Sequence, residues 1–235
     1  KVAKHVIFLV HDNILDLLKD NEYGIEVLSK DTKLESLNFD YHIPSMSVCS
    51  ALKLNKEGMN VKGGYIKANK KLTEKYKQKF FNTDKLKVGI AIKGNIVGNQ
   101  KRDIPDDKVK ILDKIKDAQL YCFTTDIKDD YLKKAFKKNK VINVAKKFSN
   151  FSDTAAAIEN VDIIISTDNC ILNLAGAMGK KVLGLFNYDY NLRWYELNEN
   201  SCGYFDSVKP FVNDEYDRWE ITLNKVIDII NKKEF

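Results

Sequence analysis

The chain has 235 residues and a formal net charge of +6, with 44% hydrophobic and 31% charged residues. This composition is typical of a folded globular protein and excludes a disordered chain. No apolar stretch approaches the roughly 20 residues that a membrane-spanning helix needs, so no transmembrane segment is expected.

The net positive charge comes almost entirely from lysines spread along the chain, because only Arg102, Arg193 and Arg218 are arginines. This pattern favours solvated helix faces over a nucleic-acid surface.

The four cysteines form no CxxC pair, and two of them, Cys122 and Cys170, fall in apolar segments. We therefore expect reduced thiols in a cytoplasmic protein, and neither disulfides nor a zinc site. The three histidines also lack the spacing of metal ligands.

The N-terminal part, residues 1–84, predicts a small α/β lobe. Its apolar runs and helical patterns are separated by short polar segments, with an irregular stretch around 55–68. Strands are expected at 5–10, 24–29 and 39–44, and helices at 13–20 and near 69–82.

From residue 85 to 214, short apolar runs alternate regularly with helical patterns, which predicts a doubly wound, Rossmann-like lobe with a parallel sheet. An irregular segment follows residue 187, and residues 215–235 are expected to form a helix that packs across the two lobes. The expected strands are 86–92, 118–125, 141–145, 161–167 and 181–186, and the expected helices are 106–116, 129–138, 153–160 and 169–178.

The loop KGNIVGNQKRDIP, residues 93–105, is long for a connection between a strand and a helix. In a doubly wound sheet, ligands bind at the carboxyl ends of the strands, where this loop begins. Its glycine and side-chain donors suit an anion, although the loop matches neither GxGxxG nor a Walker A motif. An ordinary surface loop is the alternative. The candidate residues are Lys93, Gly94, Asn95 and Arg102.

Two further strand-end segments carry polar candidates. Thr125 ends the run at 118–125, and Ser152, Asp153 and Thr154 precede an alanine-rich helix. One of these three is expected to be the helix N-cap. Alternatively, the helix start faces a cleft and its free N–H groups help to hold a nucleotide.

The stretch ISTDNCILNLAGAMGKKVLGLF, residues 165–186, places Ser166, Thr167, Asp168 and Asn169 between a strand and a helix. The helix start suits a phosphate, whereas the Asp168 carboxylate would repel one. Two roles avoid this conflict: Asp168 caps its own helix, or it accepts hydrogen bonds from a sugar or ribose hydroxyl. In the next loop, Arg193 beside Trp194 is a candidate for an anion or ring contact, with a surface arginine as the alternative.

These motifs resemble a known family. FSDTAAAIENVDIIISTDNCILNLAGAMGKKVLGLF is similar to the C-terminal lobe of heptosyltransferase-like (family nine) glycosyltransferases, which are often fused to tetratricopeptide repeats. VGIAIKGNIVGNQKRDIP likewise resembles the family loop V-G-x-x-W-x-G-N that ends in R-x-I-P. The resemblance covers residues 86–230 and extends weakly to FDYHIPSMS. Matching positions include Gly89, Gly94, Asn95, Arg102, Asp153, Thr154, Ser166, Asp168, Gly176 and Gly179.

The chain departs from the family pattern at several positions. Asn169 replaces a threonine, Asn173 a histidine, Lys181 a proline and Ile92 an aromatic residue. Family members also open with a strand and a glycine-containing loop, whereas this chain begins at what resembles the second strand. The N-terminal lobe is therefore expected to lack its first strand, through truncation or degeneration.

The resemblance implies an α/β fold of two Rossmann-like lobes (GT-B), with residues 1–84 on the acceptor side and 85–214 binding the donor. The implied activity is transfer of a sugar from a nucleotide-diphosphate sugar to a saccharide, lipid-linked or protein acceptor, with inversion and without metal or other cofactor. His42 is a weak candidate for the base. Alternatives are a degenerate sugar-nucleotide-binding or scaffold relative, and a phosphosugar epimerase for which no paired carboxylates are found. The implied donor site comprises Lys93, Gly94, Asn95, Arg102, Thr125, Asp153, Thr154, Ser166, Thr167, Asp168, Asn169, Asn173 and Arg193.

Overall fold

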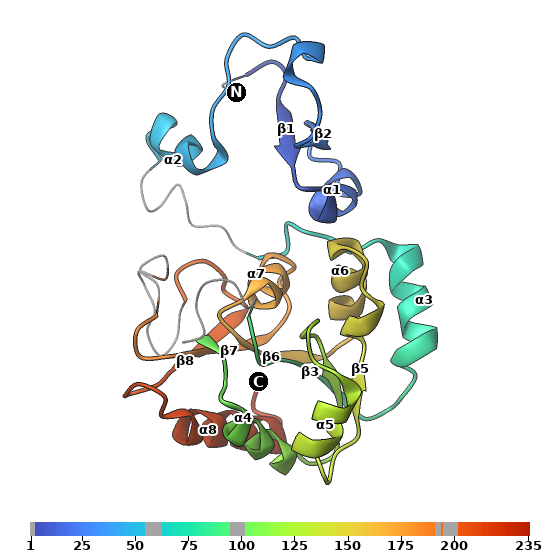
Figure 1. The fold of residues 1–235 in the computed structure, drawn as a ribbon, viewed down its shortest axis with the longest axis vertical. Coiled ribbons are helices and arrows are strands. Elements are labelled where there is room, and N and C mark those ends of the chain that lie inside the picture. The colour runs from blue at the N-terminus through green and yellow to red at the C-terminus, as the bar shows by residue number, and fades with distance from the viewer. Residues whose placement is uncertain (1–2, 55–62, 95–101, 191–193, 195–201) are drawn as a thin grey trace.

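The computed structural model describes residues 3–54, 63–94, 102–190, 194 and 202–235. Figure 1 shows a small N-terminal part at the top of the view and a larger α/β part below it. The small part contains a two-stranded parallel sheet, and the large part contains a six-stranded sheet in the order β5-β4-β3-β6-β7-β8. Every neighbouring pair in the large sheet is parallel.

The expected parallel sheet is confirmed, with five strands where apolar runs predict them. A sixth strand, β8 (Val208–Val212), lies within the segment expected to be irregular, so that expectation was wrong. β8 contains Pro210, which a central strand would not accommodate, but β8 is an edge strand with β7 as its partner. The other strands are β3 (Leu86–Ala91), β4 (Ala118–Cys122), β5 (Val141–Asn143), β6 (Ile163–Thr167) and β7 (Val182–Phe186).

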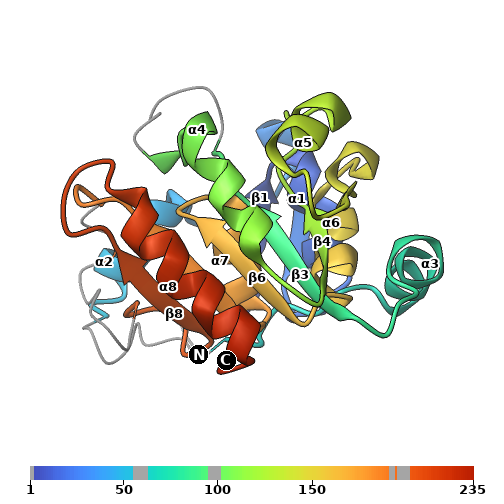
Figure 2. The same ribbon diagram turned by 90° about the horizontal axis from the view of Figure 1, so that it is seen from below.

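Helices cover both faces of the large sheet, as Figures 1 and 2 show. Successive side chains of a strand point to opposite faces, so Ile164 of β6 joins one core cluster while Ile163 and Ile165 join the other. The first cluster packs under α3 (Lys70–Phe80), α6 (Phe151–Glu159) and α7 (Cys170–Ala177). The second packs under α4 (Asp106–Val109), the 3₁₀ helix Lys110–Lys114, α5 (Asp129–Ala135) and α8 (Trp219–Lys232).

The C-terminal helix α8 buries its apolar stripe on the large sheet. Trp219, Leu223 and Val226 are fully buried among residues of β3, β6 and β7. Its neighbours also include the 3₁₀ helix Lys110–Lys114, which replaces the second half of the helix expected over 106–116. Among the described residues, no helix is both long enough and apolar enough to cross a bilayer.

The N-terminal part has less internal core than the large one. No strand forms at 39–44, so the third strand expected there was wrong; Phe39 and Ile43 are exposed in this segment. The elements begin with β1 and β2, which pair in parallel around α1, as a β-α-β unit does. They are β1 (Ile7–Val10), α1 (Asp12–Lys19), β2 (Glu26–Ser29), α2 (Val48–Ala51) and the 3₁₀ helices Leu34–Ser36 and Ser45–Ser47.

Several contacts between described residues join the N-terminal part to the large one. Leu17 of α1 is buried in the cluster beneath α6, and Asn150 donates a hydrogen bond to the Asp16 carboxylate at 3.0 Å. Farther along the chain, the backbone N–H groups of Gly64 and Ile66 both donate to the Ala177 carbonyl at the end of α7. A Cβ on Gly63 would lie 2.4 Å from the Gly176 carbonyl oxygen, so only glycine allows this close backbone approach.

Candidate functional site

The crevice at the carboxyl ends of β3 and β6 is where the strand order reverses. From β3 the chain continues outward to β4 and β5, and it then returns to place β6 on the other side of β3. The loops that follow β3 and β6 therefore leave the sheet in opposite directions, and open α/β sheets bind ligands at such a point. The polar residues from the two loops meet here.

Arg102 and Asp168 form an ion pair across this crevice. The Arg102 Nη1 atom lies 3.6 Å from Asp168 Oδ2 and donates to the Asp168 backbone carbonyl at 3.3 Å. The Asp168 side chain is only 4% exposed, whereas that of Arg102 is 34% exposed. The carboxylate is therefore held inside the protein, and the guanidinium faces the solvent side, where an anionic ligand has access to it.

Asn169 caps α7, so the alternative in which Asp168 caps its own helix was wrong. The Asn169 Oδ1 atom accepts from the N–H groups of Ile171 and Leu172, at 2.8 and 3.4 Å. These bonds satisfy two of the helix's four unpaired N–H groups, which leaves less of the helix start for a phosphate than expected. The Asn169 amide also lies 3.3 Å from the Lys93 carbonyl and thereby ties the β6 loop to the β3 loop.

The hydroxyl groups of Ser166, Thr167 and Thr124 are used within the protein. The Ser166 Oγ lies 2.9 Å from the Thr167 carbonyl and 3.1 Å from Asn169 Oδ1, while Thr167 accepts from the Asn169 amide. Thr124 accepts from the Ile92 N–H at 3.1 Å and so fixes the end of β3 against the end of β4. Its neighbour Thr125 is exposed. The hydrogen bonds of Ser166, Thr167 and Thr124 therefore hold in place the strand ends that border the crevice.

Lys93 lies at the crevice but is already engaged. Its Nζ atom is 2.6 Å from Asp106 Oδ1 and 5.1 Å from the centre of the Tyr131 ring. The hydrogen bond from Lys93 lowers the pKa of Asp106, and burial together with the bond to Asp106 raises the pKa of Tyr131. Lys93 is thus held by a carboxylate rather than directed at a ligand.

Asp103 holds the backbone of the β3 loop. Its Oδ1 atom accepts from the Gly94 N–H at 2.7 Å. Burial raises the pKa of Asp103, and the Gly94 hydrogen bond and the nearby Lys93 and Arg102 charges oppose that rise. Sequence reasoning missed Asp103, Asp106 and Tyr131. The acidic residues of RDIPDD beside a lysine-containing loop were the available signal, whereas nothing in the sequence pointed to Tyr131.

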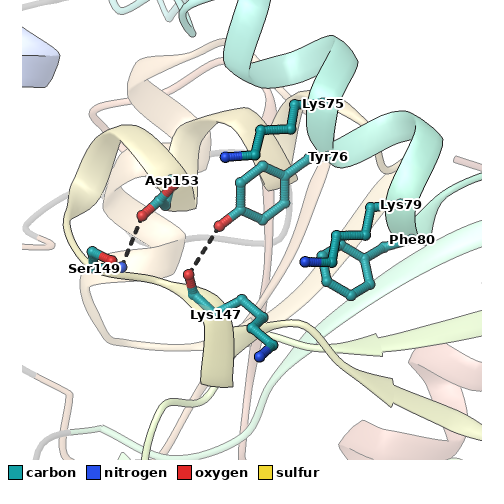
Figure 3. A pocket seen from close by; sticks show the side chains of 7 residues that line it. All are labelled: Lys75, Tyr76, Lys79, Phe80, Lys147, Ser149 and Asp153. Atoms are coloured by element: carbon teal, nitrogen blue, oxygen red, sulfur yellow. Dashed lines mark hydrogen bonds between the residues drawn. The ribbon is translucent and has the colours of Figure 1, made fainter.

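Asp153 and Thr154 lie apart from this group in the described contacts. Asn150, not one of Ser152, Asp153 or Thr154, is the N-cap of α6, because its side chain accepts from the Ser152 and Asp153 N–H groups. The Asp153 carboxylate instead accepts from the Ser149 N–H at 2.8 Å, beside α3 (Figure 3). The Thr154 hydroxyl donates back to the Asn150 carbonyl.

The remaining candidates are placed as follows. Asn173 donates to the Asn169 carbonyl at 2.8 Å, one turn earlier in α7. His42 is exposed in the N-terminal part and meets the Phe39 ring edge-on, and it does not follow a strand as expected. Asn95 and Arg193 lie outside the described residues, although Trp194, which follows Arg193, is buried against Phe186.

The described residues contain no group of three or more His, Cys, Asp or Glu arranged to hold a metal, and their four cysteines are free thiols.

Replacing Asn169 with alanine removes both the α7 cap and the link to the β3 loop. We expect Asn169→Ala to lower the free energy of unfolding by about 1–2 kcal/mol, the usual cost of losing a cap. Asn169→Ser retains a capping oxygen and is expected to recover most of this loss. Urea denaturation followed by circular dichroism compares the three proteins. Equal midpoints for Asn169→Ala and the wild type would contradict the capping role.

Comparison with known proteins gives the following similarities. No protein-family model matches the chain. The chain is 32% identical to protein FlbA of Caulobacter vibrioides over 78 residues, which are 33% of this chain and 13% of FlbA. The structure is similar to that of ADP-heptose LPS heptosyltransferase II of E. coli, with a TM-score of 0.51 and 10% sequence identity. That similarity covers 72% of this chain and 54% of the heptosyltransferase chain.

The fold is similar to that of ADP-heptose LPS heptosyltransferase II. The mixed α/β architecture and the six-stranded parallel sheet agree with this neighbour, and the expected heptosyltransferase-like GT-B fold class is confirmed. The chain spans about half of the heptosyltransferase and a much smaller part of FlbA. At this level of identity the likeness concerns the fold, and the activity has to be argued from the crevice itself.

Proposed function

We propose that the chain is a glycosyltransferase that binds a nucleotide-diphosphate sugar in the crevice between β3 and β6. The observation that carries the proposal is the Arg102–Asp168 pair at the strand-order reversal. A partly exposed guanidinium beside a helix start suits the oxygens of a diphosphate. The glycosyltransferase fold of the structural neighbour supports the same class of ligand.

In the proposed reaction, an acceptor hydroxyl gives its proton to a general base and displaces the nucleotide diphosphate at the anomeric carbon with inversion. Arg102 stabilises the negative charge that develops on the departing diphosphate, a contribution of about 3–4 kcal/mol by analogy with an oxyanion-hole donor. Asp168 orients Arg102 through their ion pair. Because its side chain is only 4% exposed, a hydrogen bond from a donor hydroxyl to its carboxylate requires the surrounding loops to move. Because Lys93 is bound to Asp106, a direct contact from Lys93 to the donor requires that ion pair to open.

The wider assignment follows the resemblance and stays a proposal. Residues 1–84 form the acceptor side, residues 85–214 form the donor side, and residues 215–235 form a helix that packs across the two lobes. The acceptor is a saccharide, a lipid-linked sugar or a protein, the reaction is metal-independent, and association with tetratricopeptide repeats is an expectation of the family resemblance. The free thiols support a cytoplasmic location, since reducing compartments preserve them.

A non-catalytic relative that binds a sugar nucleotide is the second candidate. Asn173 favours it, because this residue replaces the family histidine and its amide hydrogen-bonds within α7. Such a protein retains the crevice but lacks a group that the family places beside the donor.

Calorimetry with a panel of nucleotide-diphosphate sugars, followed by an assay of acceptor-independent hydrolysis, separates these functions. We expect binding of at least one donor and slow release of its nucleotide diphosphate in the presence of EDTA. Binding without any release would favour the non-catalytic candidate. Absence of binding across uridine, guanosine, adenosine and cytidine donors would contradict both.

A further inference from the structure

A small pocket lies outside the crevice, between α3 and the connection from β5 to α6. Its volume is about 170 Å³, and Lys75, Tyr76, Lys79 and Phe80 of α3 form one wall. Lys147, Ser149 and Asp153 form the opposite wall (Figure 3). Nothing in the proposed transfer reaction uses this pocket.

The pocket carries three lysines, and the Nζ atom of Lys79 lies 5.4 Å from the centre of the Phe80 ring. Within the described part of the chain, the Nζ atoms of Lys75, Lys79 and Lys147 make no ion pair with a carboxylate. Asp153 is the acidic residue of the lining, and its carboxylate already accepts from the Ser149 N–H at 2.8 Å. Three exposed lysines therefore line the hollow, and its one carboxylate is already hydrogen-bonded.

The rest of the pocket is held in a fixed shape. The buried Tyr76 hydroxyl donates to the Lys147 carbonyl at 3.1 Å, so α3 is pinned to the β5–α6 connection. Burial, followed by the charge of Asp153, raises the pKa of Tyr76, which keeps the hydroxyl protonated as a donor. The walls that carry the lysines are thus joined by a direct hydrogen bond (Figure 3).

The like charges in this arrangement repel one another weakly, because the three lysines are exposed to solvent. Lys75 and Lys79 are four residues apart on one face of α3, and like charges at this spacing repel each other. Lys147 adds a third positive charge from the other wall. An anion bound among the three would remove the repulsion and gain charge-assisted hydrogen bonds.

The size and chemistry of the pocket select the ligand. Pockets for whole small molecules usually measure about 300–1,000 Å³, so this one suits a single small group. Lysine ammonium groups are common phosphate ligands, and a phosphoryl dianion balances the charge better than a carboxylate does. We propose that the pocket binds the phosphoryl group of a phosphate monoester, at a site separate from the crevice.

Inorganic phosphate is the first probe, titrated into the full chain by calorimetry at constant ionic strength. We expect Lys75→Gln/Lys79→Gln to raise the Kd by about tenfold or more, because two charge-assisted contacts are lost. Lys77→Gln is the matched control, since it removes one charge from the same helix outside the pocket. An unchanged Kd in the double variant, or an equal loss in the control, would overturn the proposal. Thermal unfolding without phosphate verifies that the variants are folded.

Two further arms identify the source of the phosphoryl group. Glucose 6-phosphate tests a soluble monoester, and phosphatidylcholine vesicles with 20% phosphatidic acid, about one lipid in five, test a lipid headgroup. Binding that depends on Lys75 and Lys79 in one arm assigns that source. Binding that is insensitive to both lysines in every arm contradicts the pocket as the site.

Discussion

Arg102→Gln is expected to weaken the binding of a nucleotide-diphosphate sugar by about 10- to 100-fold. Hydrogen bonds to charged groups contribute about 1.5–3 kcal/mol, and each 1.4 kcal/mol is a factor of ten in affinity. The same variant leaves the Asp168 carboxylate, which is 4% exposed, without its guanidinium partner. We therefore also expect the free energy of unfolding to fall, by about 1–3 kcal/mol, because a buried carboxylate loses one of its charge-compensating interactions.

The control replaces the other member of the ion pair. Asp168→Asn leaves Arg102, which is 34% exposed and accessible to water, so its loss of stability is expected to be smaller than that of Arg102→Gln. In the double variant neither charge is left alone, and the two stability losses are expected not to add. Calorimetry and urea unfolding of the two single variants and the double variant, compared with the wild type, complete this double-mutant cycle. Unchanged donor affinity in both single variants would contradict the crevice as the donor site.

Trp219→Ala is expected to cost about 3–5 kcal/mol of unfolding free energy, the range for deleting a large buried aromatic side chain. Trp219 begins α8, is 0% exposed and lies in the core cluster beneath the sheet. Thermal and urea unfolding measure the effect. A loss as large as this removes much of the stability of a typical domain, so partial unfolding at 37 °C is expected.

Trp219→Phe separates packing from hydrogen bonding. The Trp219 indole N–H has no hydrogen-bond partner among the described residues, so phenylalanine removes no such bond. We expect a loss of about 1–2 kcal/mol, due to the smaller ring. A loss as large as that of alanine would show that the indole contributes more than its volume.

Much of the fold could be predicted because hydrophobic periodicity is a local signal. The run at 161–167 contains three consecutive isoleucines, Ile163–Ile165, which is typical of a strand covered on both faces, and it became a central strand. β8 was missed because Pro210 argues against a strand unless its edge position is known, and that position depends on the whole sheet. Residues 39–44 alternate as a strand would, yet no strand of the described residues pairs with them.

Sequence analysis could predict which loops form the candidate site, but not which side chains contact one another within it. The sequence located the β3 and β6 loops, but the partner of each side chain depends on contacts between distant residues. Lys93 appears as a free donor in the sequence, whereas the fold places it against Asp106. The N-cap of α6 was expected two to four residues too late, and Asp168, one of the two open possibilities for α7, precedes the true cap by one residue. Asn150 and Asn169 stand among several residues with equal capping propensity.

The junction of Gly64 and Ile66 with Ala177 gives α7 two attachments of different kinds. One end of this eight-residue helix is hydrogen-bonded to the segment that leads from the N-terminal part. The other end carries Asn169 and follows Asp168, at the crevice. A helix of this length is a stiff rod of about 12 Å. A displacement of residues 63–66 that preserves these hydrogen bonds must therefore shift the rod, and with it the geometry of the Arg102–Asp168 pair.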